Sequence, residues 1–252
     1  MLTTALALSL LAPVMVPQVM ANNEDLGYVD PTANANPGNS GANTVTYHVP
    51  ANSATGQPEI EAAKKGVLSL DGNQFRDLDG DRSLDIYEDW RKPVNQRVAD
   101  LVSKMTLSEK AGLMLINTHT PIANPADGKY VKSDDSMIVG KNMRYVIFRQ
   151  TPTVDVIAKY TNQMQELGEA SRLGIPIVVT SNPRNHASTD YTNITATQGQ
   201  HSFWPGPLGF AASGDTEVVK EFSKIAAKEW RAAGIRKVYG YTADIATDPL
   251  WA

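Results

Sequence analysis

Cysteine is absent from the 252 residues of this chain. Without a thiol there is no disulfide framework, no thiolate zinc site, no cysteine nucleophile and no lipid-modified N-terminal cysteine. The histidines His48, His119 and His201 do not have the spacing of metal ligands. The sequence also lacks the GxSxG, HExxH, GxGxxG and P-loop motifs, which disfavours a serine hydrolase, a zinc protease, a dinucleotide-binding protein and an NTPase.

An excess of positive charge is lacking as well. The chain has 23 Lys and Arg residues against 27 Asp and Glu, a net charge of −4 and a pI near 5.6. Binding to nucleic acid or to an anionic membrane surface normally requires a basic patch, so we expect neither partner. Hydrophobic residues make up 42% of the chain, which is enough to bury a core and argues against disorder of the whole chain.

The first 21 residues have the composition of a secretory signal peptide. Residues 2–21 carry no charge, residues 5–16 form an apolar run, and residues 19–21 (Val-Met-Ala) form a small-x-small cleavage site, although the usual basic N-terminal region is missing. A transmembrane anchor is the competing interpretation, but the run is shorter than the about 20 residues of a membrane span and is interrupted by Pro13 and Pro17. We predict export to the periplasm or the cell exterior, with no stable membrane insertion after cleavage.

The composition divides the remainder of the chain into three parts. Residues 22–60 are rich in Asn, Gly, Pro, Thr, Ser and Ala. Such a segment buries too little apolar surface to offset its chain entropy, so we predict a low-complexity linker or a draped arm. Residues 61–92 form an acidic, calcium-loop-like segment, and residues 93–252 form the main folded part.

Carboxylates in residues 77–88 have the spacing of a calcium loop. Against the twelve-residue EF-hand loop they fall at positions 1, 3, 5, 9 and 12, with Leu84 at the apolar position 8. The predicted ligands are Asp77, Asp79, Asp81, the Ser83 carbonyl, Asp85 through water and bidentate Glu88. Arg82 stands where the loop normally has Gly, and no second loop is found, so a structural calcium ion is favoured over a regulatory one. The alternative is a solvated acidic turn that caps a helix beginning near Tyr87.

Beyond residue 93 the apolar pattern alternates between helical and strand periods. Helices are predicted at residues 94–105, 106–115, 154–167 and 218–233, and strands at residues 144–148, 177–181 and 237–241. The second helix begins with a capping box formed by Thr106 and Glu109. Apolar strands separated by helices predict a parallel sheet covered on both faces. Ligands bind such sheets at the carboxyl ends of the strands, so the residues to inspect are 181–186 and 242–251.

Five segments resemble those of family 3 glycoside hydrolases, and they occur in the order of that family. They are residues 97–110, 173–176 with the strand after them, 203–205 with 209–213, 229–235 and 244–251. The resemblance implies an α/β fold of the (β/α)8 TIM-barrel type. A whole barrel takes about 250 residues. The residues from 143 onward suffice for about three βα units, so we expect a truncated barrel.

The resemblance implies exo-acting, retaining hydrolysis of β-linked glucosides or xylosides, with an oligosaccharide or an aryl β-glycoside as substrate. Retention needs a nucleophilic carboxylate and a carboxylic acid that becomes a base, and no cofactor is required. In this family the nucleophile is an Asp late in the barrel, in a Ser-Asp-Trp type motif, and the acid/base lies further along. Neither region occurs in the 252 residues, so we expect this chain alone to be inactive. The alternative is a non-catalytic carbohydrate- or calcium-binding remnant.

Four residues are candidates for substrate binding. Asn182, Arg184 and His186 follow the second predicted strand, and Asp244 ends the third. The family usually has Asp where Asn182 stands, and an amide cannot give two sugar hydroxyls a charged hydrogen bond. The alternatives are an ion pair for Arg184, a satisfied loop histidine for His186 and a backbone hydrogen bond for Asp244. A further departure is Leu250, which occupies a position where the family commonly has Arg.

Two tryptophans and one further function were also considered. Trp204 and Trp251 are candidates for stacking on a sugar ring, although buried aromatic side chains are more common. A cohesin-partner module is a third interpretation of the chain, and it depends on the acidic loop alone. It would require a second copy of that loop, which the sequence does not contain.

Overall fold

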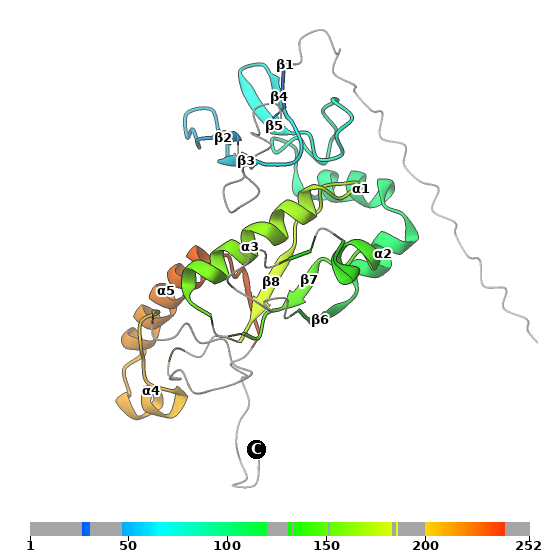
Figure 1. Cartoon of the computed structure of the whole chain (residues 1–252). Helices are drawn as coiled ribbons and strands as arrows, with labels where there is room; N and C mark the ends of the chain where they lie inside the picture. The colour runs from blue at the N-terminus through cyan, green and yellow to red at the C-terminus, as the bar shows by residue number, and fades with distance from the viewer. Residues whose placement is uncertain are drawn as a thin grey trace, which may run out of the picture.

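The computed structural model of the chain describes residues 27–30, 47–119, 131–132, 134–150, 152–182, 185 and 200–239 (Figure 1). The predicted signal peptide, the candidate residues Arg184, His186, Asp244 and Trp251, and the departure at Leu250 lie outside these residues. None of the helices in the described part has the length and apolar content needed to cross a membrane.

The N-terminal part is a small β-module, which we define as strands β1 to β5 and the loop that continues to residue 92. Its strands are β1 (Gly27–Val29), β2 (Tyr47–Val49), β3 (Ile60–Ala62), β4 (Val67–Leu70) and β5 (Asn73–Arg76). All pairings are antiparallel, with one sheet in the order β1-β4-β5 and a two-stranded sheet of β2 and β3. Phe75 is fully buried and stacks on Trp90, with 5.5 Å between the ring centroids.

Residues 22–60, which the composition predicts to be a linker or a draped arm, contribute two strands in their described part. Gly27–Val29 pairs with β4, and Tyr47–Val49 pairs with β3. A strand at a sheet edge needs little apolar surface of its own, because its partner supplies backbone hydrogen bonds and the core contacts. The composition of a segment therefore does not reveal such pairing. The predicted domain boundaries at residues 21, 60 and 92 stay predictions.

Two helices follow the β-module, as predicted. They are α1 (Val94–Lys104) and α2 (Leu107–Leu113), and the capping box at the start of α2 is confirmed, because Thr106 and Glu109 each accept the other's backbone N–H. The alternative interpretation of a helix near Tyr87 is wrong, since residues 86–88 form a turn. Within this turn Glu88 accepts a backbone N–H bond, which competes with helix formation.

The parallel pairing of the predicted sheet is confirmed, with one additional strand, whereas its cover on both faces stays a prediction. Its strands are β6 (Ile116–Thr118), β7 (Tyr145–Ile147), β8 (Val178–Ser181) and β9 (Lys237–Val238). They are all parallel and lie in the order β6-β7-β8-β9. The remaining elements are the short π-helix η3 (Ser136–Gly140) and the helices α3 (Val154–Glu169), α4 (Pro207–Ser213) and α5 (Thr216–Ala232).

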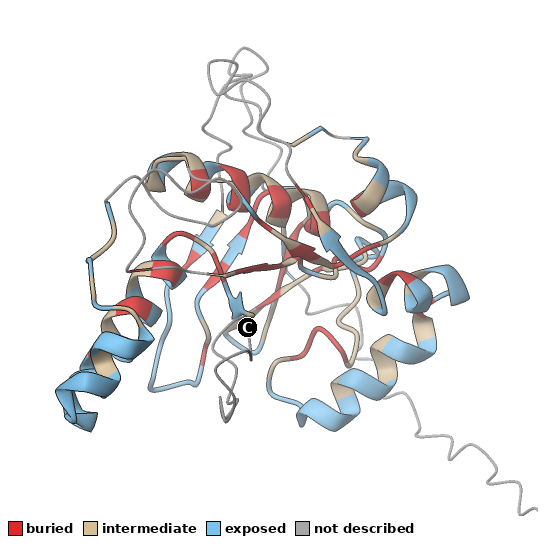
Figure 2. Ribbon diagram, turned by 90° about the horizontal axis from the view of Figure 1, so that it is seen from below, coloured by how far each residue is buried: buried red, intermediate tan, exposed pale blue. Residues whose placement is uncertain are grey.

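The main core lies between the sheet and the helices α3 and α5. Figure 2 shows the buried residues along the strands and along the facing sides of the helices. Val146, Phe148 and Val179 belong to this core, together with Tyr160 of α3 and Trp230 of α5. Because side chains alternate along a strand, the residues between them in sequence point to the opposite face of the sheet.

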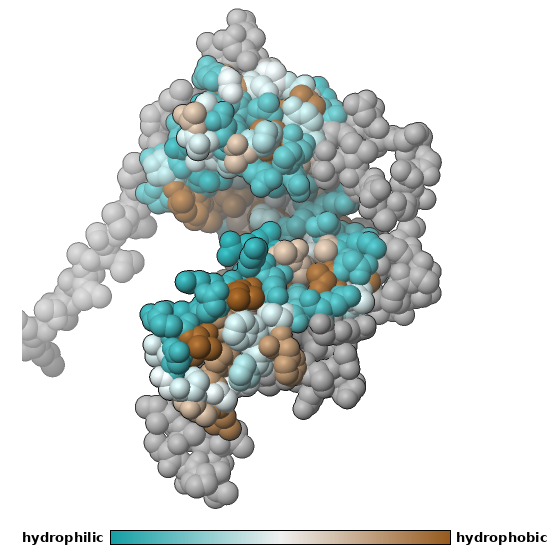
Figure 3. All heavy atoms as spheres, turned by 90° about the vertical axis from the view of Figure 1, so that its left-hand side faces the viewer, coloured by the Kyte–Doolittle hydropathy of each residue, from teal (hydrophilic) through white to brown (hydrophobic). Residues whose placement is uncertain are grey.

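The architecture is mixed α/β, with parallel and antiparallel sheets. The described strands form an open four-stranded parallel sheet and no closed barrel. The sheet contains four parallel strands, where the sequence predicted about three. The described residues therefore do not confirm a truncated (β/α)8 barrel, which stays a prediction. In the view of Figure 3 hydrophilic residues cover most of the described surface, and the apolar residues form small separate groups.

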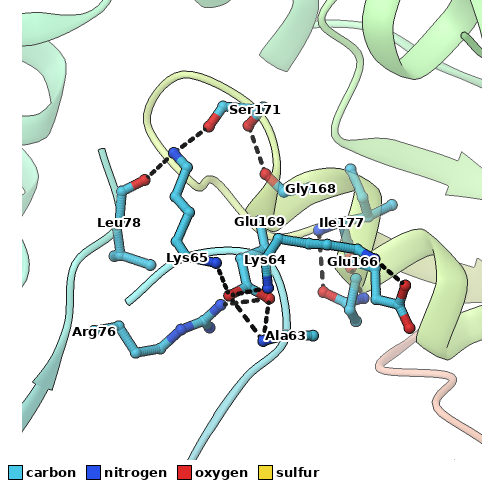
Figure 4. A network of polar contacts seen from close by, with 11 residues as sticks. Ala63, Lys64, Lys65, Arg76, Leu78, Glu166, Gly168, Glu169, Ser171 and Ile177 are labelled. Atoms are coloured by element: carbon cyan, nitrogen blue, oxygen red, sulfur yellow. Dashed lines mark hydrogen bonds and ion pairs between the residues drawn. The ribbon is translucent and has the colours of Figure 1, made fainter. Parts of the chain in front are cut away.

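The β-module is attached to α3 through a buried carboxylate (Figure 4). Glu169, the last residue of α3, is only 5% exposed. Its carboxylate accepts the backbone N–H groups of Ala63, Lys64 and Lys65 at 3.0 to 3.2 Å. The guanidinium of Arg76 lies 3.5 Å from the second oxygen. Four donors from the β-module thus converge on one side chain of the parallel-sheet part.

Lys65 makes the reciprocal attachment (Figure 4). Its Nζ donates to the carbonyl oxygens of Leu78, Ser171 and Arg172 at 2.5 to 3.2 Å. Burial lowers the pKa of Lys65 below its usual value, although neighbouring carboxylates oppose this. Gly174 lies beside the same loop with a φ of +60°, and a Cβ there would come within 2.6 Å of the Leu78 carbonyl oxygen. Only glycine fits this close approach.

Polar contacts also hold the loop of the β-module against α1. The Lys104 Nζ lies 2.6 Å from a carboxylate oxygen of Asp85. Asp100 accepts the backbone N–H of Tyr87 at 3.1 Å, and Arg97 donates to the Tyr87 carbonyl at 3.0 Å. These contacts explain how α1 is positioned although it buries none of its side chains.

Candidate functional site

The four parallel strands end at one edge of the sheet, which we call the carboxyl edge. The backbone N–H of His119 donates to the Ile147 carbonyl at 2.9 Å, and that of Tyr239 donates to the Ser181 carbonyl at 3.1 Å. These bonds continue the strand ladders past the ends of β6 and β9. The side chains gathered at this edge belong to His119, Arg149, Asn182 and Tyr239. This is the location at which parallel α/β sheets bind ligands.

Asn182 lies at the carboxyl edge, directly after β8, as the sequence predicted. Its side chain is half-buried. The strand before it is held firmly, because the Ser181 hydroxyl donates to the Phe148 carbonyl at 2.9 Å. Asn182 is the one predicted substrate-binding residue within the described part of the chain, and Arg184, His186 and Asp244 lie outside it. A sugar-binding role for all four stays a prediction.

A buried polar chain stands behind the carboxyl edge, at the end of β6. His119 is 4% exposed, and its Nδ1 lies 2.9 Å from the Tyr160 hydroxyl. Its Nε2 lies 2.9 Å from a carboxylate oxygen of Asp135. Both ring nitrogens of His119 therefore have protein partners. This group of three polar residues is not evident from the sequence, because its members are far apart in sequence and lack any metal-ligand spacing.

Two pKa values reflect the surroundings of this chain. Burial raises the pKa of the Asp135 carboxyl, but the bonds from His119 and from the backbone of η3 outweigh it and hold that pKa below its usual value. Burial raises the pKa of the Tyr160 hydroxyl, so this group stays protonated at physiological pH. The polar contacts among His119, Asp135 and Tyr160 therefore fix the end of β6 rather than offering a free acid or base.

Arg149 and Tyr239 form a second polar pair at the carboxyl edge. The Arg149 Nε donates to the Tyr239 hydroxyl at 3.1 Å, and the guanidinium carbon lies 5.8 Å from the centroid of the Tyr239 ring. The two residues follow β7 and β9, the two neighbours of β8. Neither residue is among the site residues predicted from the sequence. Arg149 directly follows a predicted strand, whereas Tyr239 lies inside the strand predicted at residues 237–241, which in the structure ends at Val238.

Trp204, a candidate for sugar stacking, is half-buried in an aromatic cluster. Its ring lies 6.3 Å from that of Phe210 and 5.6 Å from that of Phe222, measured between centroids. Its indole N–H donates to the Ser202 hydroxyl at 2.7 Å. The ring is therefore occupied by protein contacts, which favours the alternative of a packed aromatic residue over a sugar platform.

The acidic loop brings three of its predicted ligands together. Carboxylate oxygens of Asp77, Asp79 and Asp81 all lie within 4.8 Å of one another. Gly80 and Arg82 have φ values of +81° and +64°. Arg82 thus adopts the left-handed conformation for which the EF-hand loop normally uses Gly. The departure noted in the sequence is therefore compatible with the turn that a calcium loop requires.

The other predicted ligands have protein partners. Asp85 pairs with Lys104. One carboxylate oxygen of Glu88 accepts a backbone N–H group of the loop at 2.6 Å, and the other oxygen accepts one at 3.0 Å. The backbone N–H of Ser83 donates to Asp81 at 2.7 Å. Asp85 and Glu88 can therefore join a cation shell only if they exchange these partners.

The pKa values of several carboxyl groups in the acidic loop are raised, so their charged forms are unfavourable. Burial raises the pKa of Glu88 to about 8, and the carboxylates of Asp79 and Asp85 add to this effect against the backbone N–H bonds. Burial and the neighbouring Asp81 and Asp85 raise the pKa of Asp79 to about 6. The pKa of Asp77 is raised as well, again mainly by burial. A bound cation would favour the charged form of such groups.

Comparison with known proteins yields relatives but no family assignment. No model of a known protein family matches the chain. The chain is 37% identical over 207 residues to a protein of Dickeya chrysanthemi named periplasmic beta-glucosidase/beta-xylosidase, a match that covers 80% of this chain and 31% of that protein. It is 35% identical over 173 residues to beta-glucosidase C of Emericella nidulans, covering 68% of this chain and 27% of the relative.

A third relative is a probable beta-glucosidase C of Aspergillus flavus, which is 34% identical over 181 residues and matched over 28% of its length. The chain thus spans about a third of the length of the curated relatives it matches, or somewhat less. These similarities support a relationship to glycoside hydrolases of the β-glucosidase type.

Proposed function

We propose that this chain is the N-terminal part of an exported, retaining exo-β-glycosidase of glycoside hydrolase family 3. Its substrates would be oligosaccharides or aryl glycosides with a β-linked glucose or xylose. The observation that carries the proposal is the carboxyl edge, where polar residues follow four parallel strands, in a chain whose relatives are named β-glucosidases. The name of the Dickeya relative supports export to the periplasm.

In this proposal β6 to β9 are four consecutive strands of a (β/α)8 barrel, and the carboxyl edge is part of the barrel mouth. α3 and α5 would lie on the outside of the barrel, because they pack against the face of the sheet that carries Val146 and Val179. The opposite face would then line the barrel interior. The barrel architecture accounts for an open sheet whose two outer strands, β6 and β9, each have one unpaired edge among the described residues.

Asn182 is the proposed contact to the sugar hydroxyls, joined by Arg184, His186 and Asp244 from the segments that follow β8 and β9. An amide donates one hydrogen bond and accepts another, which suits a pair of neighbouring hydroxyls. No cofactor is required for hydrolysis by two carboxyl groups. The nucleophile and the acid/base are not assigned to any residue of this chain, so the proposal is that it binds β-glycosides without turning them over.

The proposal is tested by saturation-transfer NMR on the 252-residue chain with methyl β-glucoside and methyl β-xyloside. We expect transfer from the protein to at least one of them, and none to methyl α-glucoside. Asn182→Ala should weaken the binding, whereas Asn162→Ala, on the exposed side of α3, should leave it unchanged. Absence of binding to both β-glycosides contradicts the proposal. Appreciable hydrolysis of an aryl β-glucoside would contradict the expectation that this chain lacks the catalytic carboxylates.

A second function, structural cation binding by the acidic loop, is favoured by the three carboxylates that lie within 4.8 Å of one another. We propose that calcium binds to Asp77, Asp79 and Asp81, and that the Ser83 carbonyl, Asp85 and Glu88 complete the shell after exchange of their present partners. A chain that bound calcium and sugar without catalysis would be the non-catalytic remnant that the sequence leaves open.

Calorimetric titration of the EDTA-treated chain with Ca²⁺ tests the second function. We expect binding that Asp79→Asn removes, because this substitution takes away a central carboxylate. The matched control is Asp155→Asn on α3, where the carboxylate is exposed and pairs with Thr153 and Lys159. A wild-type chain that shows no heat with millimolar Ca²⁺, or an Asp79→Asn variant that binds as well as wild type, contradicts it.

A further inference from the structure

The Arg149 side chain lies on the face of the parallel sheet that is turned away from the helices. Val146 and Phe148 belong to the core against α3 and α5. Since successive side chains alternate, Tyr145, Ile147 and Arg149 point to the other face. The ring of Tyr145 lies 5.2 Å from the Lys237 ammonium of β9, which places residue 237 on that same face. Arg149 is thus at the carboxyl end of the face that points away from α3 and α5.

The partner of Arg149 lies across the end of β8. β7 and β9 are the two neighbours of β8, so the bond from the Arg149 Nε to the Tyr239 hydroxyl, 3.1 Å long, passes over the position where β8 ends. Asn182 is the first residue after β8. The guanidinium is therefore held next to the residue that the sequence selects as a sugar contact.

The guanidinium is oriented but not saturated. Nε is bonded to the Tyr239 hydroxyl, and the guanidinium carbon lies 5.8 Å from the centroid of the Tyr239 ring. Within the described part of the chain, no hydrogen bond or ion pair is formed by its Nη1 and Nη2 groups, and the residue is exposed. Two planar amino groups in a fixed fork match two neighbouring oxygen atoms of a ligand.

We propose that Arg149 is a further sugar-binding residue of the carboxyl edge, and that Tyr239 is the residue that positions it. Nη1 and Nη2 donate to two neighbouring hydroxyls of the β-linked glucose or xylose unit, beside Asn182. This assignment rests on the proposed glycosidase function. It supplies the charged hydrogen bond to a hydroxyl pair that the amide of Asn182 cannot provide.

The experiment is a titration of the 252-residue chain with methyl β-glucoside and methyl β-xyloside. Saturation-transfer NMR measures the binding at each step of the titration. Arg149→Met keeps the apolar stem and removes the donors, so binding should weaken by about tenfold. Tyr239→Phe keeps the ring and removes the hydroxyl, with a smaller loss of a few-fold. Arg236→Met is the matched control, because Arg236 is also exposed but precedes β9, at the opposite edge of the sheet.

A double variant separates positioning from packing. If Tyr239 acts through Arg149, Tyr239→Phe should cost nothing further in the Arg149→Met background. A full additional loss there would overturn the positioning role. Equal binding by Arg149→Met and wild type would overturn the whole inference and leave the glycosidase proposal standing. Absence of binding by the wild-type chain would instead overturn the proposed function, and the inference with it.

Discussion

At the junction between the β-module and α3, Glu169 accepts three consecutive backbone N–H groups, and Lys65 donates to three carbonyl oxygens. At the carboxyl edge, Arg149 is exposed and has one hydrogen-bond partner among the described residues. Both places concentrate polar side chains, but the Glu169 and Lys65 side chains are bonded to protein atoms, whereas the Arg149 guanidinium keeps donors without a partner in the described part of the chain. A charged group whose capacity is filled by protein atoms contributes to stability, whereas one with unused donors is available to a ligand.

Substitutions at the junction and at the carboxyl edge should also differ in how much they destabilise the fold. Removing one partner of a buried, fully bonded charge leaves the other groups unsatisfied and is strongly destabilising. Removing an exposed charge leaves nothing unsatisfied, because water replaces it. Substitutions at the junction should therefore change stability, and substitutions at the carboxyl edge should change binding.

Glu169→Gln should have the largest effect. The amide keeps the size of the side chain but turns two donors toward the N–H groups of residues 63–65. We expect the free energy of unfolding to fall by about 3 kcal/mol, measured by urea denaturation. Glu166→Gln is the control, since Glu166 pairs with the more exposed Lys64 and should cost less than about 1 kcal/mol. Similar losses in the two variants would remove the distinction drawn for the junction.

Lys65→Met should have the next largest effect. The substitution keeps the apolar stem and leaves the carbonyls of Leu78, Ser171 and Arg172 without their ammonium donor. We expect a loss of about 2 kcal/mol in the same denaturation experiment. Lys64→Met, next to it in sequence, should be within about 0.5 kcal/mol of wild type. A Lys65→Met variant as stable as wild type would show that the loop does not depend on this ammonium.

The pH dependence of stability should reveal Glu88. Its pKa in the folded chain is about 8, whereas the usual value is 4.5. Between these pH values the folded chain keeps a proton that the unfolded chain has lost, so stability is full below the lower value and is lost as the pH rises toward 8. The expected slope in EDTA is up to about 1.4 kcal/mol for each pH unit. Glu88→Gln should flatten this slope, and so should saturating Ca²⁺.

Two results would contradict this expectation. One is a wild-type chain in EDTA whose stability does not change between pH 5 and about 8, the window set by the two pKa values. The other is a slope that Glu88→Gln leaves unaltered, which would place the titrating group elsewhere. Asp79, with a pKa raised to about 6, is then the next residue to substitute.

Arg149→Met should have the smallest effect on stability. We expect a change within about 0.5 kcal/mol, equal to that of Arg236→Met, because both side chains are exposed. Thermal unfolding monitored by circular dichroism measures both variants. A clear loss for Arg149→Met alone would make it a structural residue like those of the junction, and would erase the contrast between the two places.

The sequence predicts best where the determinants are local. The capping box of α2 depends only on Thr106 and Glu109, which are three positions apart, and it is confirmed. β6 is missed because it has three residues and only Ile116 among them is apolar, while the apolar residues just before it fall in the helix predicted at residues 106–115. β1 and β2 are missed because their pairing partners, and not their own composition, determine them.

The candidate site shows the same limit. Asn182 is found from sequence because it directly follows an apolar strand. Arg149 and Tyr239 are brought together by the parallel order of β7, β8 and β9, which the sequence of each strand does not contain. The spacing of the acidic loop finds the group of Asp77, Asp79 and Asp81, but not the pairing of Asp85 with a lysine of α1, since that contact arises from packing.

The bonds that attach the β-module join residues 104 to 107 positions apart in the chain. A ribosome adds about 5 to 20 residues each second. For roughly 5 to 20 seconds after residues 63–65 are synthesised, the glutamate that receives their N–H groups does not yet exist. During this interval the surface of the β-module that contacts Glu169 is exposed. The emerging chain is therefore most prone to aggregation in this interval.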